Sequence, residues 1–238
     1  MKHYGLIGHP LGHSFSKAYF NEKFRQEGLD CHYDNYDIED LSLIKQSILL
    51  GFNVTIPYKE TVIPYLDELD EVAAEVGAVN TAKVLPDGKL KGYNTDVIGF
   101  EFLTSHLSPL TSHFSLLLGT GGASKAVQYV LKKHGINFHL VSRDAKKGDY
   151  TYDQLTPEIV KDHLLIINST PVGMAPNIDA LPDIPYDAIT PSHTLIDLIY
   201  NPEMTLFLRH GKQHGATTIN GLAMLHAQAE ASWKIWNE

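Results

Sequence analysis

The feature that most constrains the fold is a glycine-rich turn between an apolar strand and a helix. Residues 114–118 form an apolar run, as a strand buried in a parallel sheet requires. The turn GTGGAS follows at 119–124, a helix is expected over 125–134, and a second strand is expected over 137–141. This order predicts a Rossmann-like unit, in which the turn and the helix N-terminus hold a dinucleotide pyrophosphate. The match is incomplete, because Ser124 stands where the third glycine of G-x-G-x-x-G is expected.

The residues after the second strand bear on the choice of cofactor. Ser142 and Arg143 stand where the ribose of a bound nucleotide is read. A basic residue there suits the 2′-phosphate of NADP, whereas an acidic residue accepts hydrogen bonds from the 2′-hydroxyl of NAD. Two further cations follow, Lys146 and Lys147. We therefore expect NADP(H); Asp144 favours NAD instead if its carboxylate faces the ribose, and the alternative for Asp144 is a turn or cap residue.

The stretch GFNVTIPYKE at 51–60 is a second constraint. Asn53 and Thr55 alternate along a short strand, so both side chains leave it on one face, and Pro57 ends the strand. Lys59 follows the turn. An ammonium partly withdrawn from water beside an amide and a hydroxyl can exchange a proton near neutral pH, so Lys59 is a candidate catalytic residue. The alternative is an exposed lysine at the start of a helix.

Strands and helices alternate around this stretch. Strands are expected over 4–7 and 32–36. Helices are expected over 16–27 with Ser16 as the cap, over the segment with Leu41, Ile44, Ile48 and Leu49 on one side, and over 60–76, which Gly77 ends. Because these connections are too long for hairpins, the pattern predicts an α/β fold with a mainly parallel sheet covered on both faces.

A hairpin signal brings two polar residues together. Residues 82–85 and 89–93 flank the turn Pro-Asp-Gly. Asn80 precedes this hairpin and Asp96 follows it, so we expect both in loops from which side chains reach a ligand. For Asp96 the alternative is a cap of the helix expected over 97–103.

The second half of the chain continues the alternation. The polar segment 105–112 is the expected domain boundary. Further strands are expected over 164–167 and 194–199, and further helices over 203–214 and 220–236. The last helix carries Gln228 close to its apolar stripe, where an amide is either a ligand-binding group or a packed polar residue.

Composition limits the classes of molecule that this protein is expected to bind. The net charge is −9 and no Lys/Arg cluster is longer than Lys146-Lys147, so we expect a small-molecule ligand and neither nucleic acid nor a membrane as partner. Cys31 is the single cysteine, which rules out an intramolecular disulfide and is compatible with the cytoplasm. No apolar run approaches the length of a membrane span, and no signal-peptide core forms at the start. No metal site is expected at His9 and His13, because the proline and glycine between them deny a helical face.

Taken in order, eight segments resemble the shikimate dehydrogenase family. They are HSFS at 13–16, NVTIPYKE at 53–60, GAVNT at 77–81, NTDVIGF at 94–100, GTGGAS at 119–124, INSTPVGM at 167–174, DLIYNP at 197–202 and GLAMLHAQA at 221–229. The resemblance covers essentially the whole chain. It implies a substrate domain over 1–104, a Rossmann-like NADP domain over 105–219, and a C-terminal helix over 220–238 that returns to the first domain.

The resemblance also implies an activity and its residues. The family reduces 3-dehydroshikimate to shikimate with NADPH, in the biosynthesis of chorismate and the aromatic amino acids. Lys59 and Asp96 would be the catalytic pair, and no metal would be needed. The substrate residues would be Ser14, Ser16, Thr55, Asn80, Asp96, Tyr200 and Gln228. The cofactor residues would be Gly119, Thr120, Gly121, Gly122, Ala123, Ser142, Arg143, Lys146, Lys147, Leu198 and Gly221.

Departures from the family pattern and two alternatives stay open at this point. Lys17 and Phe20 stand where the family often has proline and histidine, and Asn220 where it often has aspartate. One alternative is a quinate/shikimate dehydrogenase of broader specificity. The other is a non-catalytic shikimate sensor, against which Lys59, Asp96 and the glycine-rich turn argue. We expect a monomer or a homodimer.

Overall fold

The computed structural model describes two compact units. It covers residues 1–12, 14–46, 48–105 and 114–238. Unit 1 comprises residues 1–95 and 228–238, and unit 2 comprises residues 96–227. The division passes through two helices, α3 (Thr95–Thr104) and α7 (Leu222–Asn237). His13 lies outside the described residues, and so does the whole of the expected boundary segment 105–112 except Ser105. The domain bounds inferred above therefore stay predictions.

Unit 1 is built on a six-stranded mixed sheet with the order β2-β1-β3-β5-β6-β4. The strands are β1 (Lys2–Gly8), β2 (Cys31–Asp37), β3 (Gly51–Val54), β4 (Glu68–Leu69), β5 (Thr81–Val84) and β6 (Leu90–Tyr93). β1 pairs in parallel with β2 and β3, whereas β5 runs antiparallel to β3 and β6. The carboxyl ends of β1, β2 and β3 therefore meet the amino end of β5 at one edge.

The predictions of two helices in unit 1 are wrong. The segment after Leu41 is a 3₁₀ helix (η1, Leu41–Gln46), and Ile48, expected on its buried side, is 74% exposed. The run 60–76 holds a short 3₁₀ helix (η2, Ile63–Tyr65), β4, and only then α2 (Glu71–Val76). Proline interrupts helical hydrogen bonding at Pro64, and Asp67 accepts the Leu90 N–H instead. Gly77 does end α2 in the left-handed region, with φ of 68°.

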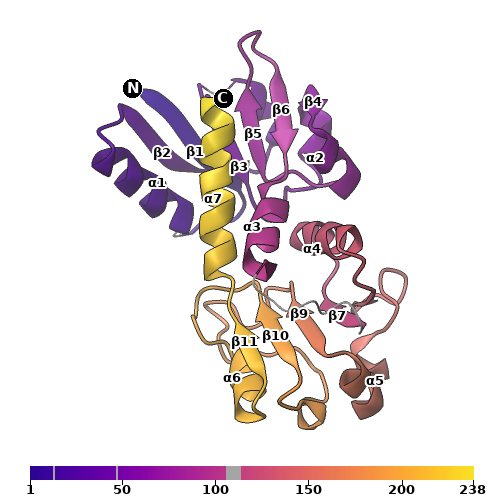
Figure 1. The fold of residues 1–238 in the computed structure, drawn as a ribbon. Helices are drawn as coiled ribbons and strands as arrows, with labels where there is room; N and C mark the ends of the chain where they lie inside the picture. Colours follow the sequence, from indigo (N-terminus) through magenta and orange to yellow (C-terminus); the bar gives the residue numbers. More distant parts are fainter. Residues whose placement is uncertain (13, 47, 106–113) are drawn as a thin grey trace. The chain divides into compact units, whose positions relative to one another are not determined.

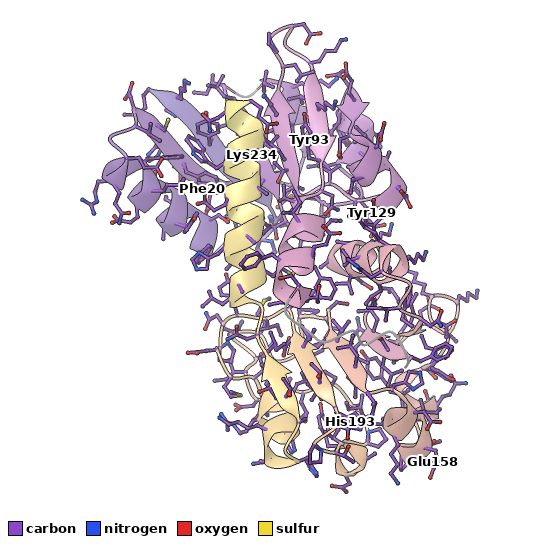
Figure 2. The ribbon with its side chains drawn as sticks, in the orientation of Figure 1. Phe20, Tyr93, Tyr129, Glu158, His193 and Lys234 are labelled. Carbon is purple, nitrogen blue, oxygen red and sulfur yellow. The ribbon has the colours of Figure 1, made fainter. Side chains whose placement is uncertain are left out.

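Aromatic side chains fill one face of this sheet. The helix α1 (Phe15–Gln26) and the last residues of α7 lie against this face (Figure 1). They cover Tyr4 and Tyr33 with Phe20, Trp233 and Trp236. Phe20 is carried by α1 (Figure 2). Its ring stacks on that of Tyr33, with the centroids 4.8 Å apart. The opposite face is mainly aliphatic, with Phe52 among its buried residues, so the sheet is covered on both sides as predicted.

Unit 2 is a parallel sheet with the order β11-β10-β9-β7-β8. Its strands are β7 (Ser115–Leu118), β8 (Phe138–Val141), β9 (Leu165–Asn168), β10 (Thr194–Asp197) and β11 (Thr217–Ile219). Its other elements are α4 (Gly122–Lys133), η3 (Tyr152–Gln154), α5 (Pro157–Asp162), η4 (Tyr186–Ala188) and α6 (Leu206–Gln213). The chain passes from β7 to β8 on one side and returns to β9 on the other. Ligands of such sheets bind at this switch point, beyond the carboxyl ends of the strands.

The α/β class and the mainly parallel pairing are confirmed. β11 and α5 are short and were not expected from the sequence. Across the described ranges, no helix is both long and apolar enough to cross a membrane.

Candidate active site

The glycine-rich turn leaves β7 at the switch point. Gly119 has φ of 102°, and a Cβ there would lie 2.8 Å from Cγ2 of Thr170, so this position requires glycine. The helix α4 begins at Gly122, earlier than the expected start at Lys125. The N–H groups of Gly122 and Ala123 thus belong to the first turn of α4, where helices leave donors unpaired by their own carbonyls.

Ser124 explains the incomplete glycine pattern. Its side chain is fully buried, and its Oγ donates to the carbonyl oxygen of Gly119 at 2.7 Å. Gln128 donates in turn to Ser124 Oγ at 3.2 Å. The serine therefore ties the turn to the helix at the position where the motif has its third glycine.

The turn after β8 directs the carboxylate of Asp144 to the backbone. Its Oδ1 accepts the Lys146 N–H at 3.0 Å, while its own N–H donates to Ser142 Oγ at 3.1 Å. Arg143, Lys146 and Lys147 are all exposed around this turn. The geometry matches the turn role that was the alternative for Asp144.

The last residue of β10 is a buried carboxylate, Asp197, for which no role was predicted from the sequence. Asp197 Oδ1 accepts from Asn168 Nδ2 at 3.0 Å and from the Ile199 N–H at 3.1 Å. Its Oδ2 accepts from Thr205 Oγ1, the N-cap of α6, at 2.6 Å. Burial raises the pKa of Asp197 to about 6, although the three hydrogen bonds act to lower it. The carboxyl therefore joins the ends of β9 and β10 to the start of α6.

The segment after Asp197 brings two predicted cofactor residues together. The Leu198 N–H donates to the Asn168 carbonyl at 3.0 Å, and the Gly221 N–H donates to the Ile199 carbonyl at 3.0 Å. A Cβ at Gly221 would collide with the Leu198 carbonyl. Only glycine lets the chain pass Leu198 this closely.

The serine loop of unit 1 is held by β2. Ser14, not Ser16, is the N-cap of α1: its Oγ accepts the Lys17 N–H at 3.2 Å. The Ser14 hydroxyl donates to Asn35 Oδ1 at 2.7 Å, and Asn35 Nδ2 donates to the Gly12 carbonyl at 3.0 Å. The expectation that Ser16 caps this helix is wrong, because the helix begins at Phe15 and places Ser16 in its first turn.

Ser16 is buried against Tyr33. Burial raises the pKa of the Tyr33 hydroxyl well above its usual value, and the Ser16 side chain acts to lower it. The candidate carboxylate-binding serines thus differ: Ser14 is a cap that contacts β2, and Ser16 enters the interior of the unit.

Lys59 and Thr55 follow β3 at the same edge. The Thr55 N–H donates to the Ile7 carbonyl at 2.9 Å, which continues the pairing with β1 beyond the end of β3. The Lys59 carbonyl accepts the Val79 N–H at 2.7 Å. Lys59 is half-buried, so the alternative of an exposed lysine does not describe it. Its carbonyl binds the N–H of Val79, which directly precedes Asn80.

Asn80 is oriented by the start of α3. Its Oδ1 accepts the Thr95 N–H at 2.7 Å, and its Nδ2 donates to Thr95 Oγ1 at 3.0 Å and to Gln228 Oε1 at 3.4 Å. Asp96 is the next residue, buried in the first turn of α3 rather than at a cap position before the helix. The edge of unit 1 therefore gathers Asn80 and Gln228 with the loops that carry Ser14, Thr55 and Lys59.

Comparison with known proteins gives the family. The family model of the shikimate dehydrogenase substrate binding domain matches residues 6–82. A shikimate dehydrogenase (NADP(+)) from Halothermothrix orenii is 41% identical over 261 residues, which cover 98% of this chain and 89% of the relative. The chain belongs to the shikimate dehydrogenase family.

Solved structures of the family and its relatives share the fold. The shikimate 5-dehydrogenase of Thermus thermophilus, in complex with NADP(H) and shikimate, is 30% identical with a TM-score of 0.86, covering 99% of this chain and 93% of that one. The quinate dehydrogenase of Corynebacterium glutamicum, in complex with NAD, is 25% identical with a TM-score of 0.86, over 99% of this chain and 93% of that one.

The departures from the shikimate dehydrogenase pattern have structural reasons at two positions. Lys17 supplies the N–H that Ser14 caps, which a proline lacks, and its Nζ lies 2.6 Å from Asp34 Oδ1. Phe20 is buried in the aromatic face of unit 1. Among the described residues, no three histidine, cysteine or acidic side chains gather as a metal site.

Proposed function

We propose that this chain catalyses the reversible NADPH-dependent reduction of 3-dehydroshikimate to shikimate, with Lys59 and Asp96 transferring the proton. The observation that carries the proposal is the 41% identity over 98% of the chain with an NADP(+)-dependent shikimate dehydrogenase. NADPH supplies the hydride when bound. The protein supplies binding, orientation and the proton.

The glycine-rich turn fits a pyrophosphate. Beside Gly121 a Cβ would meet no atom within 4 Å, so the turn opens onto free space, whereas at Gly119 the backbone conformation excludes a side chain. We assign the pyrophosphate to the backbone of Gly119 to Ala123, including Thr120, because helix N-termini present N–H donors and a partial positive charge to phosphates.

The turn after β8 fits the 2′-phosphate of NADP. Arg143 presents a planar guanidinium with several donors, and Ser142, Lys146 and Lys147 adjoin it. The carboxylate of Asp144 accepts a backbone N–H within the turn, which supports its role as a turn residue. Leu198 and Gly221 are assigned to the nicotinamide end.

Shikimate is assigned to the edge of unit 1, with Asp96 and Tyr200 as further candidate residues. The carboxylate of shikimate would receive hydrogen bonds from the hydroxyls of Ser14 and Ser16, once the Ser14 hydroxyl turns away from Asn35 Oδ1, with Tyr200 nearby. The ring hydroxyls are assigned to Thr55, Asn80, Asp96 and Gln228.

Lys59 would complete the reaction by proton transfer. Hydride addition to the carbonyl carbon leaves negative charge on the carbonyl oxygen, and a proton must reach that oxygen. The Lys59 ammonium donates it, and in the reverse direction the neutral amine with the Asp96 carboxylate accepts it from the hydroxyl. The Lys59 carbonyl accepts the N–H of Val79, the residue before Asn80, and Asp96 follows Thr95, whose N–H donates to Asn80 Oδ1. Both residues are thus held near Asn80, which supports this pairing.

The test is steady-state kinetics of Lys59→Met, followed by nicotinamide absorbance with shikimate and NADP. We expect kcat to fall by roughly 10² to 10⁴, the range of a lost general acid or base, with little change in KM for shikimate. Lys234→Met is the matched control, because Lys234 is 79% exposed and should leave kcat unchanged. An unchanged kcat for Lys59→Met would remove this residue from the mechanism.

A quinate/shikimate dehydrogenase is the second candidate. The fold shared with a quinate dehydrogenase favours testing it. Comparable kcat/KM for quinate and shikimate would establish the broader specificity, whereas activity with shikimate alone supports the first candidate. The cytoplasmic location and a monomer or homodimer stay predictions.

A further inference from the structure

A buried chain of hydrogen bonds crosses unit 1 from Tyr33 to Ser232, one helical turn from Gln228. The Tyr33 hydroxyl, beside Ser16, donates to Asn53 Oδ1 at 2.8 Å. Asn53 Nδ2 donates to Ser232 Oγ at 2.9 Å, and Ser232 lies on α7 one helical turn after Gln228. The residues that flank this chain, Ser16 and Gln228, are assigned to shikimate, whereas none of the three within it is.

Ser232 is the point at which α7 joins this chain. Its side chain is fully buried, and its Oγ lies 2.8 Å from Thr81 Oγ1 and 3.2 Å from Thr95 Oγ1. Its hydroxyl also lies 2.9 Å from the Gln228 carbonyl, to which it can donate. One small side chain of α7 thus contacts residues of β3, β5 and the start of α3.

The contacts of the Gln228 carboxamide with Asn80 and Thr95 are long. Its Oε1 accepts from Asn80 Nδ2 at 3.4 Å and from Thr95 Oγ1 at 3.5 Å, both near the limit of a hydrogen bond. A small movement of α7 would therefore break both contacts. Their geometry depends on the rotation and height of α7, the helix to which Ser232 also belongs.

Stability alone does not account for the polar cluster that Ser232 forms with Asn53, Thr81 and Thr95. Apolar residues of similar volume stabilise a core at least as well as buried polar groups, whose hydrogen bonds must first offset the loss of hydration. The aromatic contacts of Trp233 and Trp236 already pack α7 against the sheet. What hydrogen bonds add is direction, because they define one arrangement of their partners.

We propose that Ser232 is a positioning residue for shikimate binding, which acts by fixing Gln228 against Asn80 and Thr95. The proposal rests on the proposed function, in which the Gln228 carboxamide binds a ring hydroxyl. Asn53 supports Ser232 from β3 and connects it to Tyr33.

The expected effect is on shikimate alone. Ser232→Ala removes the hydrogen bonds of one hydroxyl, and we expect KM for shikimate to rise about 3- to 10-fold, the range for one neutral hydrogen bond. KM for NADP should stay unchanged. Ser232→Cys nearly preserves the side-chain volume but forms weak hydrogen bonds, so it should behave as Ser232→Ala does; recovery in this variant would assign the effect to a cavity.

A double-mutant cycle with Gln228→Ala separates positioning from general loosening. If Ser232 acts through Gln228, then Ser232→Ala should change KM for shikimate little in a Gln228→Ala background. The control is Trp236→Phe, which removes another polar contact of α7 with the sheet, from Trp236 Nε1 to the Ala82 carbonyl at 3.0 Å, and leaves the cluster intact. This control should lower the free energy of unfolding without raising KM for shikimate.

The outcomes separate the positioning role of Ser232 from the substrate role of Gln228. Equal effects of Ser232→Ala in both backgrounds, or none in either, overturn the positioning role while the role of Gln228 stands. An unchanged KM for Gln228→Ala contradicts the substrate role of Gln228, and the positioning role with it. A Ser232→Ala protein too unstable to assay leaves Ser232→Cys to run through the same cycle.

Discussion

Replacing Asp197 with asparagine removes a buried titrating group while keeping its hydrogen bonds. The side-chain oxygen of asparagine accepts from Asn168 and Ile199 as Asp197 Oδ1 does, and its amide donates to Thr205 once that hydroxyl turns. Asparagine therefore imitates the protonated carboxyl. Comparing the two proteins over pH isolates the ionisation of Asp197.

The size and sign of the effect follow from the raised pKa. The shift from 3.8 to about 6 corresponds to about 3 kcal/mol, because one pKa unit is about 1.4 kcal/mol. The folded protein holds this proton more tightly than the unfolded chain. As pH rises from about 4 to about 6 the unfolded chain ionises first, so the wild type loses stability relative to Asp197→Asn. Above that window the difference is constant.

The assay is urea unfolding at several pH values, with amide hydrogen exchange at Ile199 as the local probe. Both tryptophans lie in unit 1, so their fluorescence does not follow the surroundings of Asp197 directly. We expect the free energy of unfolding of the wild type, minus that of the variant, to fall by about 3 kcal/mol across the window. A difference that stays constant or rises with pH contradicts a raised pKa of Asp197 in the folded protein.

Two further predictions concern the ligands. Replacing Ser14 and Ser16 together with alanine should raise KM for shikimate far more than KM for NADP; equal effects on both constants indicate that the pair serves the start of α1 alone. Arg143→Ala should lower kcat/KM for NADP by about 10- to 150-fold, the range for a charge-assisted contact, and leave the value for NAD nearly unchanged. A wild type that prefers NAD, or a variant that loses both cofactors alike, contradicts the assignment of the 2′-phosphate.

Strongly patterned segments of this fold were predictable from the sequence. The strand before Gly119 is apolar and is followed by a turn that requires glycine, so its position and the direction of α4 follow from local chemistry. The β5–β6 hairpin was predictable for the same reason. In contrast, the periodicity of 60–76 suggested one helix, whereas Pro64 and the pairing of Asp67 with Leu90 impose short elements.

The site was predictable where it consists of a motif and not where it depends on distant partners. Ser14 and Ser16 are both credible caps, and only the helix start at Phe15 distinguishes them. Asp197 is a single polar residue in an apolar run, and Ser232 lies on a helix that also carries Glu230 and Lys234. A local pattern does not show that either side chain is buried and hydrogen-bonded. Asn53 and Ser232 are 179 positions apart, so their contact is invisible to any local pattern.

The division of unit 1 into two stretches of sequence has a consequence for synthesis. Residues 1–95 leave the ribosome first, but the segment 228–238 that completes their unit follows only after about 130 further residues. At roughly 5–20 residues per second, the earlier stretch waits on the order of ten seconds for its last helix. During that time Asn53 has no Ser232 to bind, and Tyr4 and Phe20 lack the indole of Trp236 that covers them. A nascent chain halted before residue 228 therefore exposes an aromatic surface, and this intermediate is the form on which chaperone binding or aggregation of this protein should be sought.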